Sequence, residues 1–269
     1  MGQRLGQHFL RDVRVLDAIL SAARIQPGQR VLEIGPGPGN LTERLSVAVG
    51  PRGKVVAIEA DRLLAHGLKG RFANVEVVVG DAVKVDLATV GGGGRFDHIV
   101  ANLPYLISGP ISVAFLELLR DPATRWGDAV LMYQREFAER LLASPGTKDY
   151  GRLTVHAARW WRADSLIDVP PAAFDPPPQV DSMVIRLTPH PVPPFAVADE
   201  ALWTAIVDGA FQQRRKKMRN TVPPAVAGRV PKETCLAALD GLGLSDLRPE
   251  DVPAQDYARL VERLVGSPA

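Results

Sequence analysis

Short apolar runs alternate with amphipathic stretches along the first part of the chain, and this pattern constrains the fold more than any other feature. Five runs rich in Val, Ile and Leu occur between residues 30 and 133, separated by segments with helical spacing. Such alternation is typical of a parallel sheet with helices on both faces, because each strand must return to the same edge through a crossover helix. The predicted strands are residues 30–34, 54–59, 75–79, 96–101 and 129–133.

Helices and two further strands complete this expectation. Leu16, Ile19 and Ala23 recur at helical spacing, so a lead-in helix is predicted ahead of the first strand. Apolar runs on either side of a proline-rich stretch predict the last two strands of the same sheet, at residues 165–169 and 183–187. The expected fold class is therefore α/β, with a mostly parallel seven-stranded sheet. Crossover helices are predicted at residues 41–49, 111–119 and 137–143.

A change in composition marks the end of this sheet region. Four prolines fall within residues 189–194, as in a linker between domains. Beyond them, helical spacing returns in residues 202–211, 232–239 and 256–264. We therefore predict two domains: residues 1–190 hold the sheet, and residues 191–269 form a small α-helical C-terminal domain.

The composition excludes several classes of protein. The single cysteine, Cys235, cannot form an intramolecular disulfide framework or a Cys-rich zinc site. The five histidines are scattered along the chain, so no metal site is expected. No apolar run approaches the ~18–20 residues of a membrane helix, and the first residues lack the apolar core of a secretory signal. A cytoplasmic protein with no membrane partner is expected.

A glycine-rich turn follows the first predicted strand. Gly35, Gly37 and Gly39 allow a sharp turn and a close approach of the backbone to a ligand. Glu59 ends the second strand, 20 residues after Gly39, where nucleotide-binding α/β folds place an acid on the ribose hydroxyls. Asn40 stands where a dinucleotide fingerprint has its third glycine. The pattern E-x-G-x-G-x-G instead resembles the first motif of Rossmann-like class I methyltransferases, which implies a binding site for S-adenosylmethionine.

A further candidate for the donor site follows the third predicted strand, at Gly80, Asp81 and Ala82. A carboxylate at the carboxyl end of a strand can accept a hydrogen bond from the adenine amine of the donor. Asp is also a common helix-capping and turn-forming residue. The position of this motif after the first two favours the binding role for Asp81 and Ala82.

The motif Asn102-Leu103-Pro104-Tyr105 follows the fourth predicted strand and is the most informative in the chain. The exocyclic amine of adenine is a poor nucleophile, because its lone pair is delocalised into the ring. The Asn102 side-chain oxygen and the Leu103 carbonyl can accept hydrogen bonds from the two N–H groups of this amine. These hydrogen bonds direct the lone pair of the nitrogen at a methyl group. Pro104 stiffens the turn, and Tyr105 offers a flat face for an unstacked base, worth ~1–3 kcal/mol. Because attack on a sulfonium is a direct displacement, alignment should supply most of the rate, and no Ser/His/Asp triad is expected.

Together these motifs resemble those of the KsgA-type ribosomal RNA adenine N6-dimethyltransferases, closest to the archaeal and eukaryotic branch. The resemblance also covers residues 6–10, 131–138 and 150–153, and the pattern F-x-P-P-P-x-V-x-S at residues 174–182. It implies methylation of two adjacent adenines in a hairpin loop near the 3′ end of small-subunit ribosomal RNA, during ribosome biogenesis. The donor would be S-adenosylmethionine and the partner the pre-ribosomal small subunit, with the protein acting as a monomer.

The resemblance also assigns roles to single residues. Tyr105 and Phe174 would hold the target adenine between them, although a role for Phe174 as a core aromatic beside the prolines stays open. Donor contacts are implied for His8, Leu10, Gly35, Glu59, Asp81 and Asn102.

A basic segment lies in the predicted C-terminal domain. Five of the nine residues from Phe211 to Arg219 are cations, although the net charge of the whole chain is only +2. Runs of charge are often only solvated helix faces, but the KsgA-type family carries a similar element. Phosphate contacts that position the RNA without reading its bases are therefore favoured. The candidate residues are Arg214, Arg215, Lys216, Lys217 and Arg219.

The predicted activity is that of an S-adenosylmethionine-dependent rRNA (adenine-N6,N6-)-dimethyltransferase. One alternative is a large-subunit rRNA adenine methylase of the erythromycin-resistance type. Another is a non-catalytic RNA-binding assembly factor that retains the fold. A small-molecule methyltransferase is less favoured, because it would leave the basic segment and the C-terminal domain unexplained.

Overall fold

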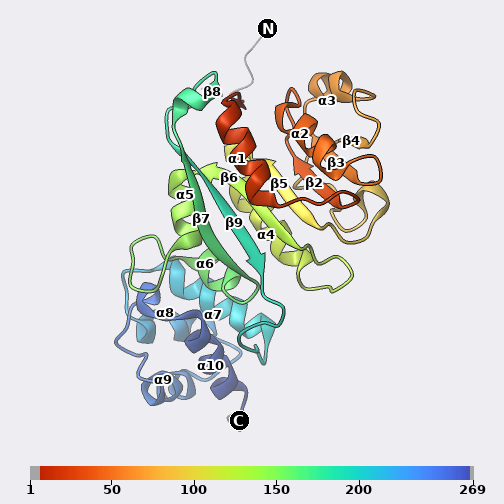
Figure 1. The fold of residues 1–269 in the computed structure, drawn as a ribbon. Coiled ribbons are helices and arrows are strands. Elements are labelled where there is room, and N and C mark those ends of the chain that lie inside the picture. The colour runs from red at the N-terminus through yellow and green to blue at the C-terminus, as the bar shows by residue number, and fades with distance from the viewer. Residues whose placement is uncertain (1–6, 267–269) are drawn as a thin grey trace. The chain divides into compact units, whose positions relative to one another are not determined.

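The computed structural model describes residues 7–266, so Gly6 of the N-terminal motif lies outside the described residues. The chain forms two compact units (Figure 1). The first comprises the chain up to Ala138 together with Arg162–Pro189, and the second comprises Glu139–Trp161 and the chain from His190 onward. Within the described part of the chain, no helix combines the length and the apolar character that crossing a membrane requires.

The division between the units differs in one segment from the predicted domains. The later boundary falls in the proline-rich linker, between Pro189 and His190, but Glu139–Trp161 belongs to the second unit rather than the first. Tyr150 and Val155 of this segment are buried in the core of the second unit. The segment thus packs with helices that follow much later in the sequence, which hydrophobic periodicity alone does not reveal.

Seven strands form the sheet of the first unit: β2 (Arg30–Ile34), β3 (Lys54–Glu59), β4 (Val75–Val79), β5 (His98–Asn102), β6 (Asp128–Gln134), β7 (Trp161–Val169) and β9 (Ser182–Pro189). Their order is β4-β3-β2-β5-β6-β9-β7. The strands from β2 to β6 pair in parallel, and β9 pairs antiparallel with β6. The predicted mostly parallel, seven-stranded sheet is confirmed. β3 and β5 are buried along almost their whole length, as expected for apolar runs in a sheet covered on both faces.

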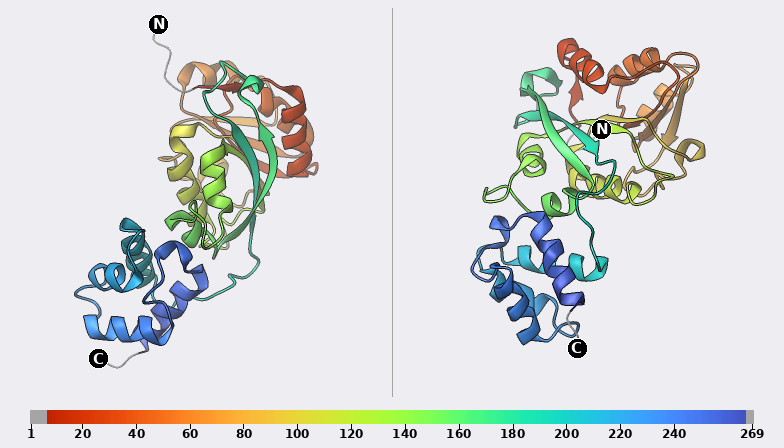
Figure 2. Two further views of the ribbon diagram at one scale, coloured as in Figure 1. Left: turned by 90° about the vertical axis from the view of Figure 1, so that its left-hand side faces the viewer. Right: turned by 60° about the horizontal axis from the view of Figure 1, so that its bottom comes forward.

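Helices cover both faces of this sheet. α1 (Val13–Ala23) and α2 (Asn40–Val49) pack together on one face, and α4 (Ser108–Leu118) lies on the other (Figure 2, left). Asp12 caps α1 by accepting hydrogen bonds from the backbone N–H groups that follow it. α3 (Arg62–Leu68) has only seven residues, too few to show a helical period in the sequence. α5 (Arg135–Leu142) follows β6, and its sequence runs from the first unit into the second.

A small second sheet ties the N-terminal segment to the proline-rich stretch. β1 (Phe9–Leu10) pairs antiparallel with β8 (Phe174–Asp175), so that Leu10 lies opposite Phe174. The backbone N–H of Arg11 extends this contact by donating to the carbonyl of Ala173 at 2.9 Å. Strands of two residues carry no periodic signal, so the sequence did not predict this pairing.

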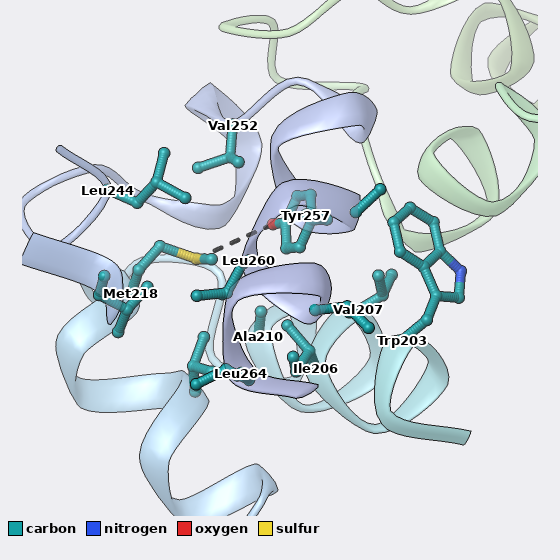
Figure 3. Close-up of a cluster of buried hydrophobic side chains, with 14 of the residues drawn as sticks. Trp203, Ile206, Val207, Ala210, Met218, Leu244, Val252, Tyr257, Leu260 and Leu264 are labelled. Carbon is teal, nitrogen blue, oxygen red and sulfur yellow. Dashed lines mark hydrogen bonds between the residues drawn. The ribbon is translucent and has the colours of Figure 1, made fainter. Parts of the chain in front are cut away.

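The second unit is helical, as predicted for the C-terminal domain. Its buried core includes Trp203, Ile206 and Leu260 (Figure 3). The Tyr257 hydroxyl donates to the carbonyl of Pro249 at 2.9 Å. Its helices are α6 (Arg152–Ala157), α7 (Glu200–Gln212), α8 (Met218–Ala225), α9 (Lys232–Gly241) and α10 (Ala254–Val265). Short 3-10 helices of the chain are η1 (Val90–Gly92), η2 (Tyr105–Ile107), η3 (Pro171–Ala173) and η4 (Pro249–Asp251).

Candidate active site

A cavity lies in the first unit where the parallel strands end. β2, β3 and β5 end at the same edge of the sheet, and the order β3-β2-β5 makes this the point where the chain changes direction across the sheet. Open α/β sheets bind their ligands at such a switch point. The cavity holds about 730 Å³ of space that is partly open to solvent. The predicted site residues in its wall are His8, Leu10, Gly35, Gly37, Glu59, Asn102, Leu103, Pro104 and Tyr105.

The glycine-rich turn needs its glycines for conformation and for space. Gly35, Gly37 and Gly39 have φ angles of 65°, 57° and 93°, in the left-handed region that favours glycine. A Cβ atom on Gly35 would lie 3.2 Å from the ring of Pro104, and one on Gly37 would lie 3.0 Å from the ring of Phe9. The turn therefore brings the target-base motif and the N-terminal segment close to the backbone after β2.

Glu59 connects the loops that follow the first two parallel strands. Its side chain is buried, and its two carboxylate oxygens accept hydrogen bonds from the backbone N–H groups of Gly37, at 3.0 Å, and Asp61, at 2.9 Å. A carboxylate oxygen can accept more than one hydrogen bond. Glu59 can therefore shape the loop after β2 and still accept from a ligand in the cavity.

Glu33 is a site residue that the sequence analysis did not single out. It lines the cavity with a side chain that is 1% exposed, and its Oε2 has no hydrogen-bond partner within the described part of the chain. Burial, together with the nearby charge of Glu59, raises the pKa of Glu33 to about 8, although Thr42 acts in the opposite direction. The sequence did contain a signal for this residue, because Glu33 is the acid that begins the E-x-G-x-G-x-G pattern.

The N-terminal segment fixes the amide of Asn102. The Asn102 Nδ2 group donates to the main-chain carbonyl of His8 at 3.3 Å. The His8 ring is itself held, because its Nδ1 donates to the carbonyl of Pro176 at 2.8 Å. With the Asn102 nitrogen turned toward His8, no residue of the described chain donates a hydrogen bond to the Asn102 side-chain oxygen, which can accept from a ligand.

The rest of the target-base motif is held from two sides. Leu103 is buried, and its backbone N–H donates to the carbonyl of Met132 at 3.2 Å. The hydroxyl of Tyr105 lies 2.7 Å from the Oγ of Ser182. The rings of Tyr105 and His8 are tilted by 32° with their centres 5.8 Å apart.

Four predicted residues are not among the residues of the described chain that form the cavity wall: Gly39, Asp81, Ala82 and Phe174. Asp81 accepts a hydrogen bond from the backbone N–H of Val83 at 3.0 Å and lies 3.6 Å from the ammonium group of Lys84, so it supports a turn. Ala82 is buried. Phe174 is 5% exposed and packs in the core between the sheet and α1 and α2.

The basic segment of the second unit contains two kinds of cation. Arg214 donates to Glu250 at 2.9 Å and to the carbonyl of Lys148 at 2.6 Å, so it connects distant parts of the unit. Lys217 and Arg219 share Asp246, at 2.8 and 2.5 Å. The side chains of Arg215 and Lys216 are exposed, and no ion pair involves them among residues 7–266.

No cluster of three or more His, Cys, Asp or Glu side chains that could hold a metal ion occurs in the described residues. The groups in the cavity wall are two buried acids, an oriented amide, a phenol and backbone groups. The Glu59 carboxylate suits a cationic ligand or a hydroxyl donor, and an oriented carbonyl oxygen suits an amine.

The sheet topology and this cavity define a Rossmann-like, S-adenosylmethionine-dependent methyltransferase. Residues 2–235 match the ribosomal RNA adenine dimethylase family. The chain belongs to this family.

Relatives of the chain come from archaea and bacteria. It is 46% identical over 224 residues to a probable ribosomal RNA small subunit methyltransferase A from Methanosarcina barkeri, covering 82% of this chain and 72% of the relative. It is 39% identical over 272 residues to the ribosomal RNA small subunit methyltransferase A of Pseudomonas fluorescens, covering 99% of this chain and 94% of the relative.

Two solved structures share most of the fold. A dimethyladenosine transferase from Plasmodium falciparum has a TM-score of 0.77 at 30% identity, covering 94% of this chain and 96% of that one. The 23S rRNA methyltransferase ErmE has a TM-score of 0.69 at 28% identity, and the match covers 96% of this chain and 99% of that one.

Proposed function

We propose that the protein transfers methyl groups from S-adenosylmethionine to the N6 amine of two adjacent adenines in small-subunit ribosomal RNA. The target is a hairpin loop near the 3′ end, methylated in the cytoplasm during ribosome biogenesis. The observation that carries the proposal is the oriented Asn102 amide, whose free oxygen lies in the same cavity as two buried acids. The protein acts as a monomer in this proposal.

The cavity fits the methyl donor by charge and by shape. S-adenosylmethionine supplies an electrophilic methyl group on a positively charged sulfur. The buried carboxyl of Glu33, whose Oε2 has no hydrogen-bond partner among the described residues, offers a polar group to the ligand, and Glu59 retains capacity to bind hydroxyls. The left-handed glycines let the backbone approach the ligand. We assign the donor site to His8, Leu10, Gly35, Gly37, Glu59 and Asn102, which line the cavity. Gly39, Asp81 and Ala82, which lie outside the cavity wall of the described residues, stay predicted donor contacts.

Asn102 and Leu103 prepare the adenine amine for attack. The Asn102 oxygen accepts a hydrogen bond from one N–H of the adenine amine, and the Leu103 carbonyl accepts one from the other. These two hydrogen bonds draw the nitrogen toward a tetrahedral shape, with its lone pair directed at the methyl group of the donor. Pro104 fixes the direction of the Leu103 carbonyl. Holding the reacting atoms in line converts a bimolecular reaction into an effectively unimolecular one.

Tyr105 supplies the surface on which the unstacked base lies, and Phe174 supports the base from the opposite side. Phe174 reaches this position through β8, which pairs with β1 at the cavity wall. Because Phe174 is buried in the described chain, its contact with the base requires a local rearrangement around its ring.

The exposed cations of the second unit bind phosphates. Arg215 and Lys216 carry most of this role, since Lys217 and Arg219 share one acid and Arg214 is engaged within the unit. Such contacts fix the RNA in place without reading its sequence.

Large-subunit RNA is the second candidate substrate, because the fold also resembles that of ErmE. The test offers labelled S-adenosylmethionine with undermethylated small subunits or large-subunit RNA. We expect label in the small subunit only. Label in the large-subunit RNA would favour the second candidate, and binding to either RNA without label would favour a non-catalytic assembly factor.

A further inference from the structure

Ser182 holds a fixed position beside the target-base motif. It begins β9, where it pairs with Gln134 of β6, and its side chain is completely buried. The preceding residue, Asp181, accepts a hydrogen bond from the backbone N–H of Arg135 at 2.9 Å. The Arg135 side chain also forms an ion pair with the side chain of Asp181 at 3.7 Å. The backbone that carries Ser182 is therefore anchored by both a sheet and a charged contact.

The hydroxyl of Ser182 holds the far end of the Tyr105 ring. The two hydroxyl oxygens are 2.7 Å apart, so one donates to the other. At its near end, Tyr105 begins the 3-10 helix η2 directly after Pro104. Partial burial raises the pKa of the Tyr105 hydroxyl, which keeps it protonated. A ring held at both ends cannot rotate freely about its side-chain bonds.

The segment from Phe174 to Ser182 contacts the cavity wall at both of its ends. Near its start, Pro176 accepts the hydrogen bond from His8, and at its end Ser182 contacts Tyr105. His8 in turn faces the Tyr105 ring and supplies the carbonyl that orients Asn102. The segment thus sets the geometry of both groups that receive the adenine.

We propose that Ser182 is a positioning residue, whose hydroxyl holds the Tyr105 ring in the plane that stacks on the target adenine. This inference rests on the proposed function. Without the Ser182 hydroxyl, the ring samples several rotamers, and each adenine has to select the productive one. The affinity for the RNA and its rate of methylation fall, while the affinity for the donor does not change.

The test is a double-mutant cycle on kcat/KM for the RNA, measured at saturating S-adenosylmethionine with Ser182→Ala, Tyr105→Phe and the double variant. Each single change should lower kcat/KM roughly fivefold, the loss expected for one hydrogen bond between neutral groups. The double variant should be no worse than either single one, because both changes remove the same contact. Donor affinity, measured by calorimetry, should stay at the wild-type value.

A second Ser–Tyr pair in the same unit provides the control. Ser112 donates to the carbonyl of Ser108 at 2.7 Å and lies 2.9 Å from the Tyr133 hydroxyl, in the core and outside the cavity wall formed by the described residues. Ser112→Ala should lower the melting temperature and leave kcat/KM unchanged. Wild-type kcat/KM in Ser182→Ala, or a double variant whose loss is the product of the single losses, would overturn the inference. Failure of the proposed function is separate, since the wild-type protein would then methylate no adenine.

Discussion

At the scale of single residues, the buried acid Glu33 contributes to the pH dependence of stability. Its pKa is raised to about 8 from the ordinary 4.5, so the folded protein holds this proton at pH values where the unfolded chain has released it. The stabilising contribution of the neutral carboxyl is complete below the unfolded pKa. It is lost as the pH rises through the folded pKa.

Replacing Glu33 with Gln should therefore remove one source of pH dependence. As the pH rises from about 5 to about 9, the free energy of unfolding of the wild type should fall relative to that of Glu33→Gln. Denaturant unfolding of the donor-free protein at several pH values measures it. Glu43→Gln, an exposed acid on α2, is the control and should follow the wild-type profile. A pH-independent difference for Glu33→Gln would show that this acid ionises normally.

Asn102 is the residue on which the proposed chemistry depends most. Asn102→Ala removes the acceptor for the adenine amine, so kcat should fall by at least ~100-fold, as for the loss of a preorganised polar contact at a reacting centre. Donor affinity should change only a few-fold. Asn40→Ala is the matched control, because the Asn40 amide also donates to the N-terminal segment, at the Leu10 carbonyl 2.8 Å away. A normal rate in Asn102→Ala would exclude this residue from the mechanism.

At the scale of elements, long apolar runs were predictable and short tertiary elements were not. The runs at residues 30–34, 54–59 and 75–79 coincide with β2, β3 and β4, because continuous runs of apolar and β-branched residues leave a strong local signal. β1 and β8 exist only through their mutual pairing, and the two prolines inside α8 hide its helical character.

Phe174 shows how this affects the site. The pattern F-x-P-P-P-x-V-x-S identified the residue, but only the β1–β8 pairing shows that it lies in the core beside the cavity. The proposed contact with adenine and a packing role make different predictions for a change that nearly conserves volume.

Phe174→Leu should lower kcat/KM for the RNA several-fold through lost stacking, with a loss of stability below about 1.5 kcal/mol. Phe115→Leu provides the comparison. Phe115 lies in α4, where it is fully buried against Trp126, and it is not part of the cavity wall formed by the described residues. That variant should lose stability alone. If Phe174→Leu lowers the melting temperature and keeps the wild-type kcat/KM, Phe174 is a core residue only.

At the scale of the whole molecule, charge is balanced overall and the basic segment is local. The sequence located this segment, but it could not separate cations that act within the unit from those left exposed, because Glu250 and Asp246 approach only in the folded chain. The same holds for the cavity. The sequence motifs identified the loops that form it, but the orientation of the Asn102 amide, which His8 sets, could be seen only in the structure.

The two kinds of cation should behave differently when neutralised. Arg215→Gln with Lys216→Gln should weaken RNA binding and reduce the slope of log K against log salt by roughly 1.5, the value for two phosphate contacts. Their stability should match that of the wild type. Arg214→Gln should instead lower the melting temperature, because it removes contacts with Glu250 and the Lys148 carbonyl. An unchanged salt slope in the double variant would make the segment a solvated surface.

The most direct measurement of the central claim is nucleoside mass spectrometry of small-subunit RNA after reaction with the wild-type protein and S-adenosylmethionine. Digestion should yield N6,N6-dimethyladenosine, mapped to two adjacent adenines in one hairpin loop near the 3′ end. Methyl groups on any other nucleoside, or unmodified adenines after complete binding of the RNA, would contradict it.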